Sequence, residues 1–189
     1  MSCSQSSNTS FSKRFLRFFS VLAVALAATA LSTEGSVAQT QGAQLLGQFG
    51  DWGAYTAAPG GKKICFALAK PTQSDTVPPG RPRDPAWFFV STRPAEKVKE
   101  EVSVIFGYPF KANTDATVEV GSINFAMYTQ NDGAWVKNAA EEARLVDALR
   151  KAGSDVTVRG ESGRGTKTID KFSLKGVAQA LDRAAQECR

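Results

Sequence analysis

The chain contains no histidine among its 189 residues. That absence excludes Ser-His-Asp and Cys-His catalysis, histidine-ligated zinc, and the usual general base near neutral pH. Other chemical motifs are also missing. After residue 38 there is no Ser-x-x-Lys, no Gly-x-Ser-x-Gly, no Walker A loop and no acidic spacing typical of a calcium loop. We therefore predict no catalytic residue, no metal site and no cofactor.

The first 38 residues have the pattern of a secretory leader. Basic Lys13, Arg14 and Arg17 precede the apolar run 18–31, and a small-x-small site ends at Ala38. This order is typical of a signal peptide, and the run is shorter than the roughly 20 residues that a membrane-spanning helix needs. We expect cleavage after residue 38 and a mature protein in the periplasm, at the cell surface or in the medium.

Much of the positive charge belongs to this leader. The whole chain has 23 basic and 18 acidic residues, and the leader holds three of the basic residues and one of the acidic residues. The mature chain thus keeps 20 basic and 17 acidic residues, a net charge of +3. That value gives little reason to expect nucleic-acid binding.

Two cysteines remain after the leader, because Cys3 lies within it. In an exported chain they permit a single disulfide, Cys65–Cys188. Two buried free thiols, or two reactive thiols, are the alternatives. The bond would join an early strand to the last helix and would stabilise the fold by about 5 kcal/mol on a chain-entropy argument.

Short apolar or alternating runs predict nine β-strands after the leader. They are 52–57, 63–69, 87–92, 102–106, 117–120, 123–128, 134–137, 154–161 and 167–172. Residues 87–90 (Trp-Phe-Phe-Val) are apolar on both faces, which indicates a central strand covered on each side. Residues 39–48 are polar and rich in Gly and Gln, so we expect a flexible N-terminus before a single domain at 49–189.

Two helices are predicted late in the chain. Asn138 and Glu141 form a capping-box-like pair ahead of an apolar stripe, which predicts a helix over about 138–152. Ser173 could cap a second helix over about 173–188, whose apolar stripe includes Cys188. Short strands with two late helices favour a mainly β fold, a β-sandwich with two added helices.

Two basic regions are the predicted contact sites for a partner. The segment 71–85 contains five prolines, so we predict an irregular loop there. The predicted hairpin 159–171 could present a positive strip to an anionic glycan. A plain connector and a lysine-protected edge strand are the alternative interpretations of these two regions. The candidate contact residues are Arg81, Arg83, Arg164, Lys167 and Lys171.

Carboxylates offer a catalytic route that the absence of histidine leaves open. Two acids about 5–9.5 Å apart could act as they do in glycosidases. The candidates are Asp51, Asp84, Asp132, Asp155, Glu161 and Asp170. Each lies beside a turn or strand end, where acidic residues are common for local hydrogen-bonding reasons. A hydrolase is therefore an alternative to a binding function, not the first hypothesis.

Several short motifs follow one another from residue 49 to residue 188. They are Phe49-Gly50-Asp51-Trp52, Lys63-Ile64-Cys65, residues 84–94 (DPAWFFVSTRP), Gly107-Tyr108-Pro109-Phe110, Asp132-Gly133-Ala134-Trp135, and the segment 173–188 with its closing cysteine. In this order they resemble the invasion-associated locus B family of Gram-negative, mostly alphaproteobacterial, bacteria. The resemblance implies an immunoglobulin-like β-sandwich, an exported envelope location and an association with host-cell entry in pathogenic members. It implies no known catalytic site or cofactor.

The sequence predicts the structural environment of four residues in these motifs. We expect Trp52, Trp87 and Trp135 to fill the core. Arg93, at the end of the most apolar strand, either pairs with an internal carboxylate or faces a partner, and it joins the candidate contact residues.

Three functions are consistent with the sequence. The first is a non-enzymatic module that binds an envelope or host-surface protein, or an anionic glycan, without binding nucleic acid or being an integral membrane protein. The second is a histidine-free, carboxylate-dependent hydrolase of envelope polymers. The third is a structural envelope-integrity factor with no discrete ligand.

Overall fold

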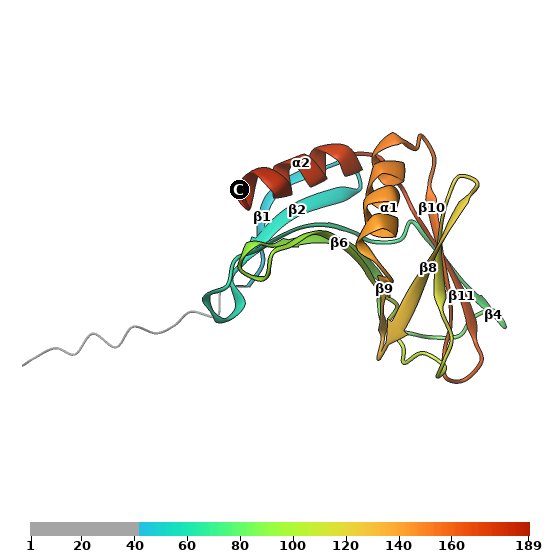
Figure 1. The fold of residues 1–189 in the computed structure, drawn as a ribbon. Coiled ribbons are helices and arrows are strands. Elements are labelled where there is room, and N and C mark those ends of the chain that lie inside the picture. Colours follow the sequence, from blue (N-terminus) through green and yellow to red (C-terminus); the bar gives the residue numbers. More distant parts are fainter. Residues whose placement is uncertain (1–41) are drawn as a thin grey trace, which may run out of the picture. The chain divides into compact units, whose positions relative to one another are not determined.

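The computed structural model describes residues 42–189, so the predicted leader 1–38 lies outside the described residues. These residues form one 11-stranded antiparallel sheet in the order β1-β2-β3-β5-β6-β9-β8-β7-β10-β11-β4 (Figure 1). The strands are β1 (Gln44–Phe49), β2 (Trp52–Ala57), β3 (Ile64–Ala69), β4 (Gln73–Val77), β5 (Trp87–Arg93), β6 (Val98–Ile105), β7 (Ala116–Val120), β8 (Ile123–Gln130), β9 (Gly133–Val136), β10 (Val156–Glu161) and β11 (Lys167–Phe172). Short 3-10 helices η1 (Pro59–Gly61) and η2 (Pro94–Glu96) lie in two of the connections.

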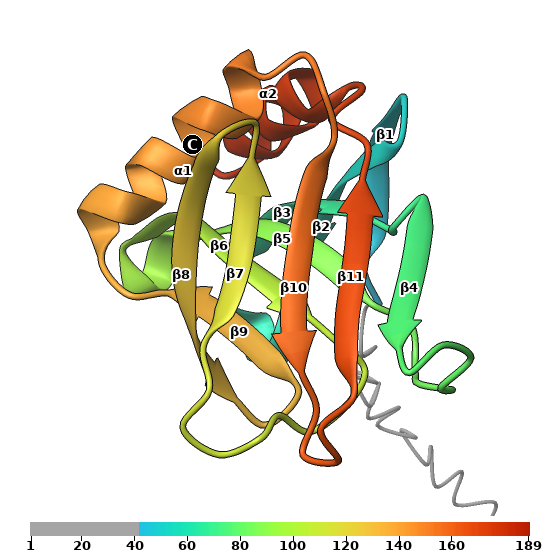
Figure 2. The same ribbon diagram turned by 90° about the vertical axis from the view of Figure 1, so that its right-hand side faces the viewer.

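The sheet forms two layers that share one core. It bends between β6 and β9, so that β7, β10 and β11 run across the direction of β3, β5 and β6 (Figures 1 and 2). Phe88 of β5 and Phe172 of β11 are both fully buried, with ring centroids 5.5 Å apart. The predicted mainly β fold is therefore confirmed, and the two facing layers are consistent with a β-sandwich.

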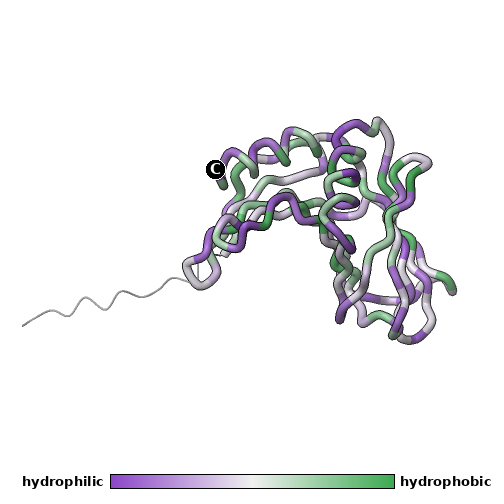
Figure 3. Tube along the Cα trace, viewed as in Figure 1, coloured by the Kyte–Doolittle hydropathy of each residue, from purple (hydrophilic) through white to green (hydrophobic). Residues whose placement is uncertain are grey.

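Helix α1 (Ala139–Lys151) begins as the sequence predicts. The Asn138 side-chain oxygen accepts a hydrogen bond from the backbone N–H of Glu141 at 3.0 Å, which satisfies one of the free donors of the first turn. The helix buries Leu145, Val146 and Leu149 and packs beside β6, β7 and β9. Polar and apolar residues both occur along it in Figure 3, as expected for a helix with one buried side.

Helix α2 (Val177–Glu187) begins later than predicted. Its N-cap is Gly176 at φ 90°, and the predicted cap, Ser173, instead accepts a bond from the Lys175 backbone N–H at 3.2 Å. A Cβ on Gly176 would lie 1.8 Å from the carbonyl oxygen of Phe49, so only glycine fits this turn. The helix packs on β1, β2 and β3.

Two edge strands are absent from the sequence prediction. Residues 73–77, predicted as irregular loop, pair with β11 as β4, and residues 44–49 pair with β2 as β1 although 39–48 was predicted to be flexible. Both strands end the sheet order, and all of their residues are exposed or half-buried. An edge strand needs no apolar alternation to remain paired, so the pattern that reveals inner strands is missing here.

Only one of the three tryptophans lies in the core. Trp52 is fully buried, and its indole N–H donates to the backbone oxygen of Ser173 at 2.8 Å. Trp87 and Trp135 are half-buried on the opposite face of the sheet, so the core prediction is wrong for both. Side chains alternate across a strand, and in β5 it is Phe88 and Val90 that point to the core.

Candidate functional site

The segment 71–85 presents only one of its two predicted contact arginines. Arg81 is exposed. The side chain of Arg83 is 11% exposed and pairs with the fully buried carboxylate of Asp170 on β11. Its other nitrogen, Nη1, donates to the backbone oxygen of Phe106 at 2.8 Å. Arg83 therefore fastens the segment to the core, whereas a contact role for Arg81 stays a prediction.

A small polar cluster surrounds this buried ion pair. The hydroxyls of Tyr108 and Thr168 are 2.6 Å apart, and burial raises the pKa of Tyr108 to about 12. The second carboxylate oxygen of Asp170, Oδ2, is buried and has no hydrogen-bond partner among the described residues. Burial of charged and polar groups costs free energy unless these groups bind one another. The stability of the fold therefore depends on the contacts within this cluster.

Arg93 is held by two internal carboxylates. Its guanidinium donates to both oxygens of Glu101, at 3.0 and 2.9 Å, and its Nε donates to Glu96 at 2.8 Å. The bond to Glu101 is the main reason that the pKa of Arg93 is raised. Of the two alternatives open in the sequence, the structure shows the internal pair.

The basic hairpin does not form a purely positive strip. Arg164, Lys167 and Lys171 are exposed, and Lys167 and Lys171 share one face of β11 as predicted. However, β4 pairs with β11, so β11 is an inner strand and the edge-strand interpretation is wrong. Acidic residues occupy neighbouring positions on the same face: Asp75 on β4, Glu119 on β7 and Glu161 on β10.

Two of these acids are paired with bases. Arg159 donates to Glu119 at 3.1 Å, and Lys111 donates to Glu161 at 2.9 Å. We call this outer surface of β7, β10, β11 and β4 the charged face. Because its two signs alternate, it offers no strong attraction for an anionic polymer.

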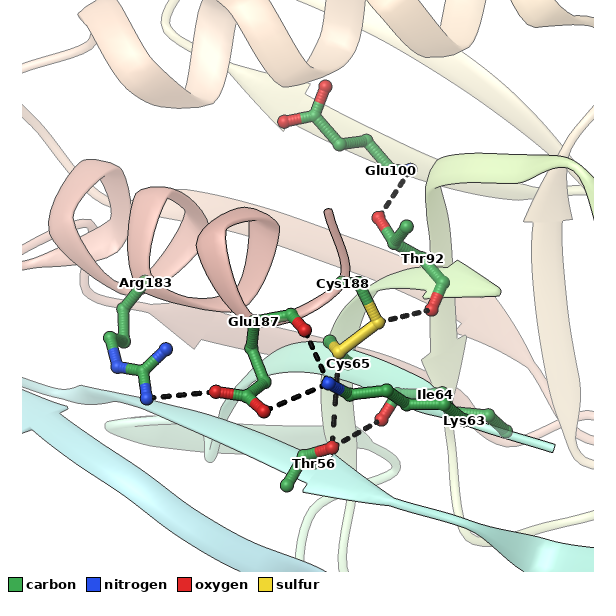
Figure 4. The surroundings of a disulfide bond; sticks show 9 residues. All are labelled: Thr56, Lys63, Ile64, Cys65, Thr92, Glu100, Arg183, Glu187 and Cys188. Atoms are coloured by element: carbon green, nitrogen blue, oxygen red, sulfur yellow. Dashed lines mark hydrogen bonds and ion pairs between the residues drawn. A yellow bond between two sulfur atoms is a disulfide. The ribbon is translucent and has the colours of Figure 1, made fainter. Parts of the chain in front are cut away.

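The predicted disulfide between Cys65 of β3 and Cys188 at the end of α2 is confirmed (Figure 4). Cys65 is fully buried, so the free-thiol alternatives are not what the structure shows. Beside it, Lys63 donates to the carboxylate of Glu187 at 2.9 Å, and Arg183 donates to the same carboxylate at 3.0 Å. These two cations, Lys63 first, lower the pKa of Glu187. The bond and the ion pairs together fix the last turn of α2 to β3.

A row of aromatic side chains lies on the outer surface of the sheet and was not predicted from the sequence. Tyr55 stacks on Phe66 with ring centroids 5.4 Å apart, and Phe66 lies 5.8 Å from Phe89. Farther along, Tyr128 stacks on Trp135 at 5.8 Å. We call this surface, with Trp87, the outer aromatic face.

Strand register aligns the two groups of rings in one row, with Ser103 between them. It places Leu68, Phe89, Ser103, Trp135 and Tyr128 side by side across β3, β5, β6, β9 and β8. Tyr128 is 43% exposed, and the other rings of the face are half-buried. The sequence of β3 contains a pattern that could have predicted this face. Its small core residues alternate with Phe66 and Leu68, which indicates a strand that is apolar on both faces.

A groove of about 410 Å³ opens at one end of the outer aromatic face. Tyr55 and Trp87 are its aromatic lining residues, Gly53 and Leu68 lie between them, and Gln48, Asp51 and Lys70 supply polar groups. The Lys70 ammonium lies 4.8 Å from the centre of the Trp87 ring. This volume falls in the range of small-molecule sites, which combine aromatic walls with a few polar groups.

The six predicted carboxylates do not come together in either of two grooves formed by residues 42–189. Of the six candidates, only Asp51 lines the first groove. A second groove of about 360 Å³ beside α1 contains none of the six. Its own acids are engaged locally: Glu142 accepts from the Val102 N–H at 2.8 Å, Glu100 pairs with Arg150 and Asp147 pairs with Lys151. Burial is the main cause of the raised pKa of Glu142.

Residues 42–189 contain no cluster of three or more cysteine, aspartate or glutamate side chains arranged to hold a metal ion. None of their helices has the length and apolar character needed to cross a bilayer.

Comparison with known proteins gives one match. No curated protein and no solved structure matches the chain. The model of one family, the invasion associated locus B (IalB) proteins, matches residues 52–185. That range runs from β2 into α2 and includes most of the sheet, the buried ion pair, and Tyr55 and Trp87 of the groove, while Gln48, Gly50 and Asp51 of the groove precede it. The chain thus belongs to the invasion associated locus B family.

Proposed function

We propose that this IalB-family protein is a non-enzymatic binding module that acts outside the cytoplasm and contacts its partner through the outer aromatic face. The partner is a component of the cell envelope or of a host-cell surface. The leader pattern of residues 1–38 and the Cys65–Cys188 bond both support an exported protein, because disulfides persist in oxidising compartments.

The outer aromatic face is the observation that carries this proposal. Phe66, Phe89 and Trp135 are large apolar side chains that remain partly accessible to solvent, and Tyr128 is exposed. Tyrosine, tryptophan and phenylalanine are enriched where proteins bind partners, and contiguous exposed apolar surface marks such sites. The charged face has the composition of an ordinary solvated surface, so it is the weaker candidate.

Photo-crosslinking in the native cell tests the proposal. A photoreactive residue is placed at Tyr128 on the outer aromatic face and, as a matched control, at Lys171 on the charged face, since both side chains are exposed. We expect a discrete crosslinked product from position 128 and none from position 171. Equal products at both positions, or none at position 128, would contradict the proposed contact surface.

A further inference from the structure

We infer that the groove at the end of the outer aromatic face binds an uncharged glycan through a pyranose ring. This inference rests on the proposed binding function and specifies the ligand of the same surface. It follows from the ring surfaces, the polar groups, the charge and the floor of the groove.

The two aromatic residues supply surfaces that match a sugar ring. Tyr55 on β2 and Trp87 on β5 are separated by the intervening strand β3, whose Leu68 lies between them. An aromatic ring has a negative face, and the C–H bonds on one side of a pyranose present a weakly positive, apolar surface to it. Two partly accessible rings across one strand can therefore hold a sugar against the groove.

The polar residues of the groove match the hydroxyl groups of such a ligand. Gln48, Asp51 and Lys70 combine an amide, a carboxylate and an ammonium group. Together they can donate to and accept from hydroxyls, which are themselves both donors and acceptors. Register places Asp51 and Lys70 opposite each other just beyond the last paired residues of β2 and β3, so these groups line one rim.

The charge of the groove favours a neutral ligand. Its one carboxylate and its one ammonium group, on Asp51 and Lys70, give a formal charge of zero. An anionic sugar acid or a phosphate would gain from Lys70 but would be repelled by Asp51. The charged face is no better for an anion, because acidic residues interrupt its basic ones.

The floor of the groove depends on a glycine. A Cβ at Gly53 would lie 2.6 Å from the ring of Tyr55, so the absence of a side chain allows this ring to lean over the strand. The tyrosine is held from the other side by Phe66, with an interplanar angle of 13°. The groove is thus formed before any ligand arrives, which lowers the entropy cost of binding.

Titration of the purified protein with neutral oligosaccharides tests the inference. The probes are chitotetraose, cellotetraose and maltotetraose, followed by calorimetry and by tryptophan fluorescence, with polygalacturonate fragments as the anionic comparison. We expect at least one neutral probe to bind, with an affinity that changes little between low and high salt, because no net charge is involved.

Matched variants locate the site. We expect Trp87→Ala and Tyr55→Ala each to weaken binding by about tenfold or more, as for the removal of a central aromatic contact. The controls Lys167→Ala and Lys171→Ala change exposed residues of the charged face, away from the groove, and they should bind like the unmodified protein. Thermal unfolding establishes that all four variants are folded before the titrations are compared.

Several results would overturn the inference. They are no binding of any neutral probe at millimolar concentration, binding that Trp87→Ala leaves unchanged, or tighter salt-dependent binding of the anionic fragments. Binding of a proline-rich peptide in the groove, without binding of any of the sugars, would also overturn the inference. In each case, a crosslinked product from position 128 would leave the proposed binding function standing, so the two failures are distinguishable.

Discussion

The outer surface of the sheet carries two neighbouring regions of opposite composition. On the outer aromatic face, Phe66, Phe89 and Trp135 take positions that point away from the core. On the charged face, Lys167, Lys171 and Arg159 alternate with acidic residues. The side chains of the charged face are hydrated by solvent, whereas the aromatic face exposes part of its apolar surface to solvent. If the proposed function holds, a single sheet combines a solvated surface with a contact surface.

The strands that form the two regions are also linked to other segments of the protein by different kinds of bond. Behind the aromatic face, β3 is joined to α2 by the Cys65–Cys188 bond. Behind the charged face, β11 holds the Pro-rich segment through the buried Arg83–Asp170 pair. One region therefore depends on a covalent bond and the other on a desolvated ion pair. Variants that remove one of these links at a time should therefore lose stability to different extents.

Removal of the disulfide should have the largest effect. Cys65→Ala with Cys188→Ala opens a loop with a sequence separation of 123 residues, and we expect the free energy of unfolding to fall by about 5 kcal/mol. Urea denaturation measures the loss, and amide hydrogen exchange should increase in β2 and β3 before β10 and β11. The reduced unmodified protein serves as the control and should resemble the variant. Equal stability of the oxidised protein and the variant would contradict this.

Truncation of the buried carboxylate should have the next largest effect. Asp170→Ala leaves the guanidinium of Arg83 without its partner at a position that is 11% exposed, and we expect a loss of about 4 kcal/mol in unfolding free energy. The surface variant Glu119→Ala, which breaks the pair with Arg159, should lose at most about 1 kcal/mol.

The double variant Arg83→Met with Asp170→Leu sharpens this test. It replaces both charges by apolar groups of similar size, so we expect it to recover part of the stability that Asp170→Ala loses. A loss as small for Asp170→Ala as for Glu119→Ala would show that the pair does not hold the segment.

Tyr108 should give a smaller effect that depends on pH. Its pKa is raised to about 12 from an ordinary value of 10, chiefly by burial. Between these two pH values the unfolded chain loses the phenol proton while the folded protein keeps it, so this residue makes stability fall as pH rises. Tyr108→Phe should cost about 1 kcal/mol at pH 7 through the lost bond to Thr168.

Above pH 10, the stability of Tyr108→Phe should fall less steeply than that of the unmodified protein. Denaturation at pH 9 and pH 11 measures the difference. Tyr128→Phe on the aromatic face is the matched control and should follow the unmodified protein. If the two variants have the same alkaline profile, the assignment of the raised pKa to Tyr108 is incorrect.

The smallest effects on stability distinguish the two outer regions directly. Phe66→Thr with Phe89→Thr removes two aromatic pairs, Tyr55–Phe66 and Phe66–Phe89, and should cost about 1 kcal/mol in total. Lys167→Glu with Lys171→Glu should change stability by no more than about 0.5 kcal/mol. The crosslinked product from position 128 should disappear in the first double variant and persist in the second. The reverse outcome would make the charged face the contact surface.

The sequence was sufficient for the inner strands and for the disulfide. β2 and β11 have the predicted bounds, because burial of one or both faces leaves an apolar pattern in the sequence. The cysteine pair followed from the count of cysteines after the predicted leader. The edge strands β1 and β4 were missed because exposed residues are free to be polar, as in the Gln-Ser-Asp-Thr-Val sequence of β4.

The site was less predictable than the fold. In β5, the residues Trp87 and Phe89 are as apolar as Phe88 and Val90, so composition does not say which pair points outward. The burial of Arg83 depends on Asp170, which lies 87 residues away, and no local pattern connects the two. The topology of the sheet decides which residues that are distant in the sequence come into contact. A single sequence, in contrast, indicates mainly the local periodicity of each strand or helix.

The position of β4 has a consequence for how the chain folds. The chain leaves β3, forms β4 at the far edge of the sheet and returns to β5 beside β3. Val77 can join the sheet only when Lys167 is present to pair with it. Cys65 can form its disulfide bond only when Cys188 is present. Neither layer can therefore complete itself from a continuous piece of chain. We expect slow, cooperative folding that cannot finish before residues 167–188 are available, so that a chain truncated before residue 167 completes neither layer.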